Sequence, residues 1–137
     1  MEIYDKYMHD IILLNPTIND YVKDKKYDHL RDRLSDFLSK EYENREKKLN
    51  QKYLSLFKKK KELSLYEKLM YEELKEYSDT LYFKGEYFPL SHSDNIFIDF
   101  ITTINSKDSS YEFTDIQSYK DYISRLKKCK RICNQMM

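Results

Sequence analysis

Apolar side chains recur at intervals of three and four residues along most of the chain, which is the period of one face of an α-helix. The first such stripe runs from Ile3 to Leu14 and ends before Asn15-Pro16. Proline disfavours helical geometry in the residue before it but suits the first turn of a helix, so residues 17–22 are predicted to form a second, short helix. Residues 24–29 are charged without an apolar period, which predicts an exposed connection.

Two long amphipathic helices are predicted next. The first begins after residue 29 and carries one apolar stripe: Leu30, Leu34, Phe37, Leu38, Tyr42, Leu49, Tyr53 and Leu56. The second runs from Ser64 to about Phe83, and Ser64 with Glu67 forms the pattern of a capping box. Its stripe is Tyr66, Leu69, Met70, Leu74, Tyr77 and Leu81. Because only residues 60–63 separate the two helices, they should pack as an antiparallel hairpin. Gly85 is expected to end the second helix as a left-handed cap.

The last third of the chain is less regular. Residues 87–94 read as a loop, and Ile96 to Ile104 is an apolar run that fits a short buried helix or a strand. A helix is favoured, because no partner strand is visible. After a polar loop at 105–110, Thr114 is predicted to cap a final helix from Asp115 to about Ile132. The residues expected to face inwards are Ile116, Tyr119, Ile123 and Leu126.

These elements predict an all-α protein, an antiparallel helical hairpin of two long helices with shorter flanking helices. A chain of 137 residues with one glycine and two prolines fits a single helical domain covering residues 1–137.

The charge balance argues against nucleic acid as a partner. Lys and Arg number 25 and Asp and Glu 24, whereas nucleic-acid binders usually carry a basic excess. The run Lys58 to Lys61 could contact phosphate or an acidic membrane surface, but a solvated helix end is favoured, because cations there complement the helix dipole. No apolar window reaches the roughly 18 to 20 residues of a membrane span. Without the basic start of a signal peptide, a cytoplasmic location is expected.

No catalytic or metal-binding constellation is recognisable. The histidines, His9, His29 and His92, lie far apart, and none belongs to a helical zinc-peptidase motif. Cys129 and Cys133 are expected to be free thiols, since half a metal site would need two more ligands from distant positions. Glycine-flanked nucleophiles and glycine-rich phosphate loops are absent. We therefore predict no catalytic residue, no metal ligand and no cofactor in this chain.

Most of the fourteen tyrosines fall on predicted helix stripes, where they would fill the core and keep their hydroxyl groups at its boundary. The predicted loop Tyr87-Phe88-Pro89-Leu90-Ser91-His92 is the better candidate for a cleft or a partner contact, because its aromatic rings do not belong to a stripe.

Three segments in order resemble a known family: Leu65 to Tyr77, the loop Tyr87 to His92, and the helix Ile116 to Leu126. The chain is similar, from about Asn15 to Leu126, to the N-terminal part of the family called domain of unknown function 885. These are large helical proteins that resemble zinc metallopeptidases of the gluzincin kind. Ser91-His92 departs from that family, which usually has Asn-Gln at this place.

The resemblance implies a non-catalytic helical N-terminal layer that packs on a catalytic half and shapes its cleft. In the family, the expected zinc motif His-Glu-x-x-Pro-Gly-His lies in that other half, so no catalytic residue carries over to this chain. The alternative is a helical protein–protein interaction module, for example of viral origin, that is unrelated to peptidases and uses its tyrosine-rich faces. Either hypothesis implies a protein partner or self-association.

Overall fold

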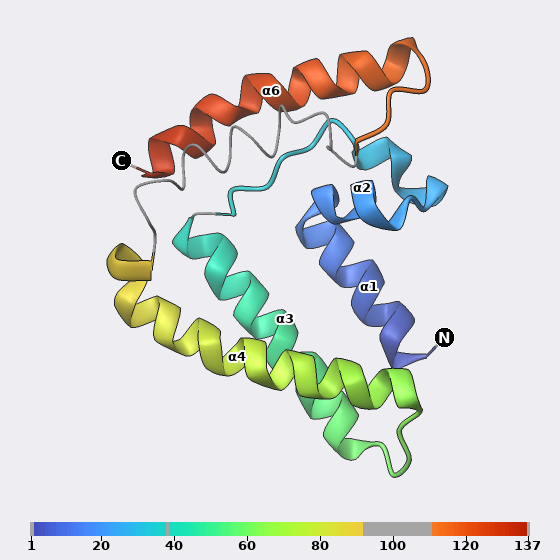
Figure 1. The fold of residues 1–137 in the computed structure, drawn as a ribbon, viewed down its shortest axis with the longest axis vertical. Coiled ribbons are helices and arrows are strands. Elements are labelled where there is room, and N and C mark those ends of the chain that lie inside the picture. The colour runs from blue at the N-terminus through green and yellow to red at the C-terminus, as the bar shows by residue number, and fades with distance from the viewer. Residues whose placement is uncertain (1, 38, 92–110, 137) are drawn as a thin grey trace.

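The computed structural model describes residues 2–37, 39–91 and 111–136, and all the regular structure in these ranges is helical (Figure 1). The α-helices are α1 (Ile3–Leu14), α2 (Asn19–Val22), α3 (Lys40–Lys59), α4 (Leu65–Ser91) and α6 (Ile116–Met136). Two 3-10 helices, η1 (Pro16–Ile18) and η2 (Lys25–Leu30), flank α2. The prediction of an all-α fold is confirmed. None of the described helices is long and apolar enough to cross a membrane.

The N-terminal helices follow the sequence closely. Helix α1 has the predicted bounds, and Pro16 begins η1, which leads directly into α2. The side chain of the buried Asn19 then binds both the backbone N–H and the carbonyl of Asp24, each at 3.1 Å. These two hydrogen bonds fix the turn that leads from α2 into η2. The prediction of an exposed connection at 24–29 is wrong for Tyr27, which is buried in the core under α1.

The first long helix is shorter than predicted. It begins at Lys40, where the Ser39 hydroxyl accepts a hydrogen bond from the Tyr42 N–H. Leu30 and Leu34 still reach the core, but from η2 and from the non-helical segment that follows it. Leu38 lies outside the described residues. Apolar residues three or four positions apart can also reach the core from a short 3-10 helix and an irregular segment. The periodicity alone therefore predicted the start of the helix too early.

The predicted hairpin of α3 and α4 is present, with α1 packed against both helices. Its core contains Tyr53, Phe57 and Leu74. The capping box also forms, because the Ser64 N–H donates to Glu67 Oε2 at 3.0 Å and the Glu67 N–H donates to Ser64 Oγ at 3.3 Å. Lys60 binds the same carboxylate at 2.6 Å and, with the Ser64 N–H, lowers the Glu67 pKa. Lys58 and Lys59 are exposed at the end of α3, as predicted.

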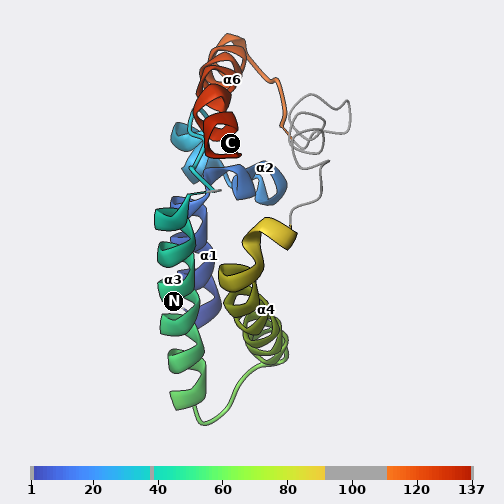
Figure 2. The same cartoon turned by 90° about the vertical axis from the view of Figure 1, so that its left-hand side faces the viewer.

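Helix α4 continues well past its predicted end near Phe83, to Ser91. Gly85 therefore lies inside the helix, and residues 87–91, predicted as a loop, form its last turns. A glycine weakens a helix without forcing it to end, and a proline can be accommodated by a kink. Figure 2 shows the last turn of α4 bent away from the axis of the preceding turns, as Pro89 would cause. His92, the apolar run 96–104 and the polar loop 105–110 lie outside the described residues.

Helix α6 begins at Ile116, because Asp115 caps it instead of Thr114, and it continues past its predicted end near Ile132 to Met136. The Asp115 carboxylate accepts from the Ser118 N–H at 2.7 Å, and Ser118 Oγ accepts from the backbone N–H groups of Thr114 and Asp115. The predicted inward face is wrong. The buried side of α6 carries Ser118, Arg125, Cys129 and Ile132, whereas Ile116, Tyr119, Ile123 and Leu126 are exposed.

The orientation of α6 has a polar cause. The segment beneath it, residues 20–36, offers carboxylates and backbone carbonyls, which the basic side chains of α6 bind. A buried carbonyl or carboxylate without a partner would be costly. The free energy gained by pairing these groups with the basic side chains therefore exceeds the free energy that burial of the apolar stripe of α6 would contribute.

Candidate functional site

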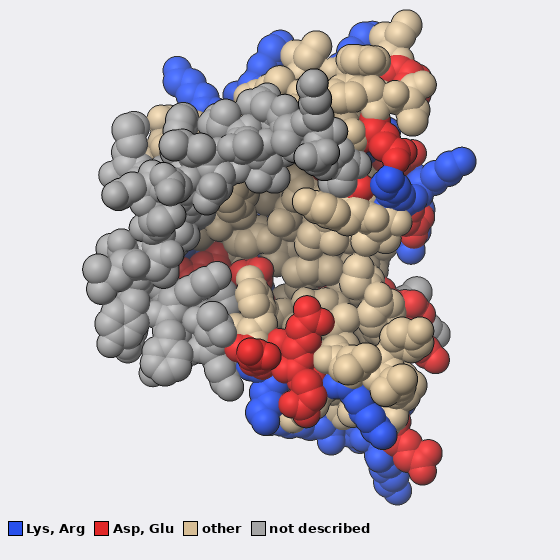
Figure 3. All heavy atoms as spheres, viewed as in Figure 1, with Lys and Arg blue, Asp and Glu red and all other residues tan. Residues whose placement is uncertain are grey.

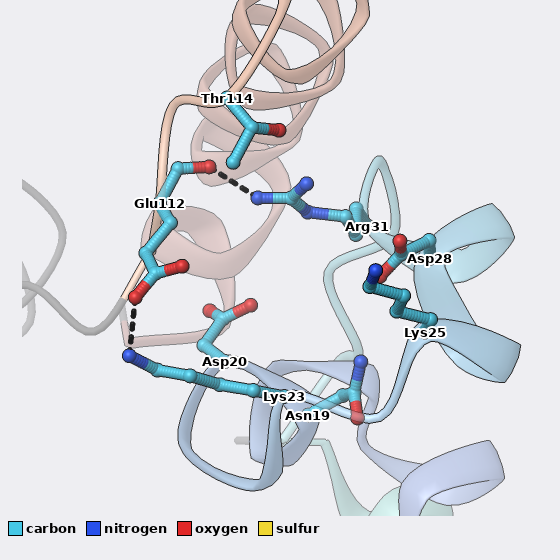
Figure 4. Close-up of a pocket in the computed structure, with 8 residues that line it drawn as sticks. All are labelled: Asn19, Asp20, Lys23, Lys25, Asp28, Arg31, Glu112 and Thr114. Atoms are coloured by element: carbon cyan, nitrogen blue, oxygen red, sulfur yellow. Dashed lines mark hydrogen bonds and ion pairs between the residues drawn. The ribbon is translucent and has the colours of Figure 1, made fainter.

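A polar hollow of about 290 Å³ lies between α2, η2 and the segment that precedes α6 (Figure 4). The side chains around it are Asn19, Asp20, Lys23, Lys25, Asp28, Arg31, Glu112 and Thr114. Within the hollow, Lys23 forms an ion pair with the Glu112 carboxylate, and Arg31 donates to the Glu112 carbonyl. The Glu112 pKa is lowered by the hydrogen bond from Lys23.

Arg125 of α6 binds two of the residues that line this hollow, Asp20 and Arg31. Its guanidinium lies 2.6 and 3.4 Å from the two carboxylate oxygens of Asp20, and Nε donates to the Arg31 carbonyl at 3.1 Å. The Tyr111 ring is held between two guanidinium groups, with its centroid 4.6 Å from Arg31 and 4.8 Å from Arg125. Cations and carboxylates neutralise one another here. We therefore interpret the polar hollow as the joint that holds α6 on the N-terminal helices.

A second hollow lies between α1, α3 and α4, and we call it the tyrosine-lined groove. It has a volume of about 350 Å³. Its lining residues are Tyr7, Met8, Ile11, Asn15, Ile18, Tyr42, Glu46, Met70, Glu73, Leu74 and Tyr77. Of these described residues, five have aliphatic or thioether side chains, three are tyrosines and two are carboxylates, and none carries a positive charge. In Figure 3 the acidic side chains gather over α4, which forms one wall of this groove.

The electrostatics of the groove are negative. The Tyr77 hydroxyl donates to Glu46 Oε1 at 3.0 Å. Burial, followed by the charges of Glu46 and Glu73, raises the pKa of Tyr7 to about 12. Burial and the Glu46 charge also hold the pKa values of Tyr42 and Tyr77 far above the ordinary range of a phenol. The three hydroxyls consequently stay protonated at any physiological pH.

These residues suit binding better than catalysis. Among the described residues that line the groove there is no histidine, cysteine, serine or lysine, and so no paired nucleophile and base. Aromatic faces beside carboxylates in an apolar hollow attract a cation that carries an apolar stem. In the described part of the chain, no group of three histidine, cysteine or acidic residues could hold a metal ion.

Tyr87, Phe88, Pro89, Leu90 and Ser91, which the sequence offered as a contact loop, belong to the last turns of α4. Their side chains lie outside the described part, and so does the whole of His92, so their role in partner contact stays a prediction. Of the other residues weighed, His9 Nδ1 lies 2.9 Å from the Tyr27 hydroxyl, Cys129 is buried and Cys133 is half-buried.

Sequence reasoning missed the groove because its tyrosines were assigned to the core. A signal was present, since Tyr42 and Glu46 are four residues apart and lie on the same side of α3. What the sequence did not show is that Tyr7 and Tyr77, from α1 and α4, lie beside them.

Comparison with known proteins adds no assignment. No protein-family model matches the chain, no curated protein matches it, and no solved structure matches its fold. The chemistry of the hollows and surfaces is therefore the only guide to function.

Proposed function

We propose that the chain is a non-catalytic helical interaction module, which binds a basic, apolar segment of a protein partner in the tyrosine-lined groove. One observation carries the proposal: two carboxylates and three protonated tyrosines line a largely apolar hollow, and none of its described lining residues is a cation.

The chemistry of the groove selects the occupant. Lysine and arginine bury their aliphatic stems on apolar surface while their charged ends seek carboxylates or aromatic faces. Met8, Ile11 and Met70 supply the apolar surface, and Glu46 and Glu73 supply the charge. A partner helix that carries apolar residues and a lysine or arginine on one face would match the groove. An acidic segment would be repelled by both carboxylates.

A matched pair of small probes tests this charge preference. Hexylammonium should bind weakly, with a Kd on the order of millimolar, and hexanoate should bind at least about tenfold more weakly. Two-dimensional NMR titration should place the shift changes at Tyr7, Tyr42 and Tyr77. Glu73→Gln should weaken hexylammonium binding several-fold. Glu62→Gln, which changes an exposed carboxylate outside the groove, is the control and should have no effect. Equal binding of the two probes would contradict the proposal.

A second candidate is the N-terminal layer of a metallopeptidase-like protein. Two of the three segments that carry the resemblance, Leu65–Tyr77 and Ile116–Leu126, lie in helices α4 and α6, which supports it. The helical geometry of residues 87–91 weakens it, because the family pattern has its Pro-Leu loop there.

This candidate predicts that the purified chain lacks peptidase activity of its own. With one equivalent of Zn²⁺ added, a quenched fluorescent peptide should be cleaved no faster than in buffer, because no metal-ligand group lies in the described residues. Cleavage that requires zinc and stops on addition of a chelator would refute a non-catalytic role.

A further inference from the structure

Two helices expose apolar side chains in continuous rows. On α4 the exposed residues are Leu65, Tyr66 and Leu69, with 70, 76 and 60% of their surface accessible. On α6 they are Ile116, Tyr119, Ile123 and Leu126, with 75, 55, 51 and 36% accessible. Single exposed apolar residues are ordinary on protein surfaces, whereas contiguous rows of this kind mark interaction sites.

The α6 row is accompanied by lysines, and the α4 row by three carboxylates, with the exposed Lys68 and Lys75 along one side of it. The exposed carboxylates of Glu72, Glu73 and Glu76 follow the α4 row at helical spacing, and together these residues form the acidic face. The exposed lysines Lys120, Lys127 and Lys130 lie along the α6 row, and together they form the basic face. Over the whole of each helix the balance is also opposite, because six of the seven charged residues in α6 are basic and six of the nine in α4 are acidic.

The two faces also match in order. Along α4 the apolar residues 65–69 come before the carboxylates at 72–76. Along α6 the apolar residues begin at 116, and two of the three lysines lie at 127 and 130, near the end of the row. With a rise of about 1.5 Å per residue, a parallel arrangement places apolar side chains against apolar side chains and carboxylates against lysines. An antiparallel arrangement would place charged groups against apolar ones.

The faces cannot meet within one chain. Helix α6 lies at one end of the long axis of the molecule and α4 lies near the other end (Figure 1). In Figure 3 basic side chains lie along the α6 edge, and a group of acidic side chains lies over α4, bordered by basic ones at the lower end of the molecule. A second copy can bring the two faces together, and a twofold axis would form the same contact twice.

From this complementarity we propose that the chain self-associates, with the acidic face of α4 in one copy packed against the basic face of α6 in a second copy. An anionic membrane would attract the basic face alone and repel the acidic one, so it accounts for only half of the exposed apolar surface. The contact is independent of the tyrosine-lined groove except at Glu73, which borders both.

Charge reversal on each face tests the contact. Sedimentation equilibrium of the wild-type chain should show a mass that rises with concentration from monomer to dimer or beyond. Glu72→Lys with Glu76→Lys, or Lys127→Glu with Lys130→Glu, should each raise the dissociation constant at least tenfold. Lys58→Glu with Lys61→Glu, which reverses two exposed lysines outside both faces, is the matched control and should leave it unchanged.

Mixing the two variants gives the decisive result. An acidic-face variant and a basic-face variant, each weakened alone, should associate with one another, because each mutated face then meets the opposite charge. Circular dichroism at 222 nm checks that both variants are folded, and Ile123→Lys, which disrupts the apolar row instead, should also prevent association. A wild-type chain that stays monomeric, or a mixture that does not associate, would overturn the proposal. So would binding of monomeric chain to phosphatidylserine vesicles through Lys127 and Lys130 without any change in mass.

Discussion

Replacing Arg125 by methionine should lower the free energy of unfolding by about 3–5 kcal/mol, the range found when one partner of a buried ion pair is removed. The Arg125 side chain is 5% exposed and Asp20 is 11% exposed, so the substitution leaves the Asp20 carboxylate without its cation. It also removes the hydrogen bond to the Arg31 carbonyl and the contact with the Tyr111 ring. Urea unfolding followed by circular dichroism would measure the loss.

A double-mutant cycle separates the ion pair from lost packing. Asp20→Asn combined with Arg125→Met should cost less than the sum of the two single substitutions, by roughly 0.5–3 kcal/mol, because the carboxylate is no longer buried alone. Lys48→Met, at an exposed position of α3, is the control and should change stability by no more than about 0.5 kcal/mol. An Arg125→Met cost below about 1 kcal/mol would mean that the joint does not hold α6.

Alkaline pH should destabilise the protein through the tyrosine-lined groove. A free phenol ionises near pH 10, whereas the pKa of Tyr7 in the folded protein is about 12. Above pH 10 the unfolded chain therefore loses a proton that the folded protein keeps, so the stabilisation is complete below pH 10 and is lost as the pH rises towards 12. Tyr42 and Tyr77 should add losses of the same sign, since their pKa values are raised in the same way.

Phenylalanine substitutions test this linkage by removing one ionisable group at a time. Tyr7→Phe should reduce the dependence of unfolding free energy on pH by at most about 1.4 kcal/mol per pH unit between pH 10 and 12, and by less if solvent screens the partly exposed ring. Tyr21→Phe, which removes a phenol that is 72% exposed, is the matched control. Since lysines also titrate in this range, the comparison between the two variants is the informative measurement. If the free energy of unfolding depends on pH equally in the two variants, the protonation of Tyr7 is not coupled to folding.

The sequence by itself determined the features that depend on neighbouring residues. Helix α1, the break at Pro16, the capping box of Ser64 with Glu67 and the turn between α3 and α4 all follow from local rules. Each rule concerns residues no more than about four positions apart, where side-chain caps, proline geometry and helical periodicity act. The all-α class followed from the same local rules.

Only the tertiary structure decided which face of α6 is buried, and it leaves Tyr66 and Leu69 of the predicted α4 stripe exposed. Periodicity assigned the apolar stripe of α6 to the interior, but Asp20 and the Arg31 carbonyl, nearly a hundred residues earlier, bind Arg125 and turn that stripe outwards. The tyrosine-lined groove likewise needs Tyr7, Tyr42 and Tyr77 from three different helices. The physical reason is that the free energy of burying a side chain depends on the groups it meets there, and these come from distant parts of the chain.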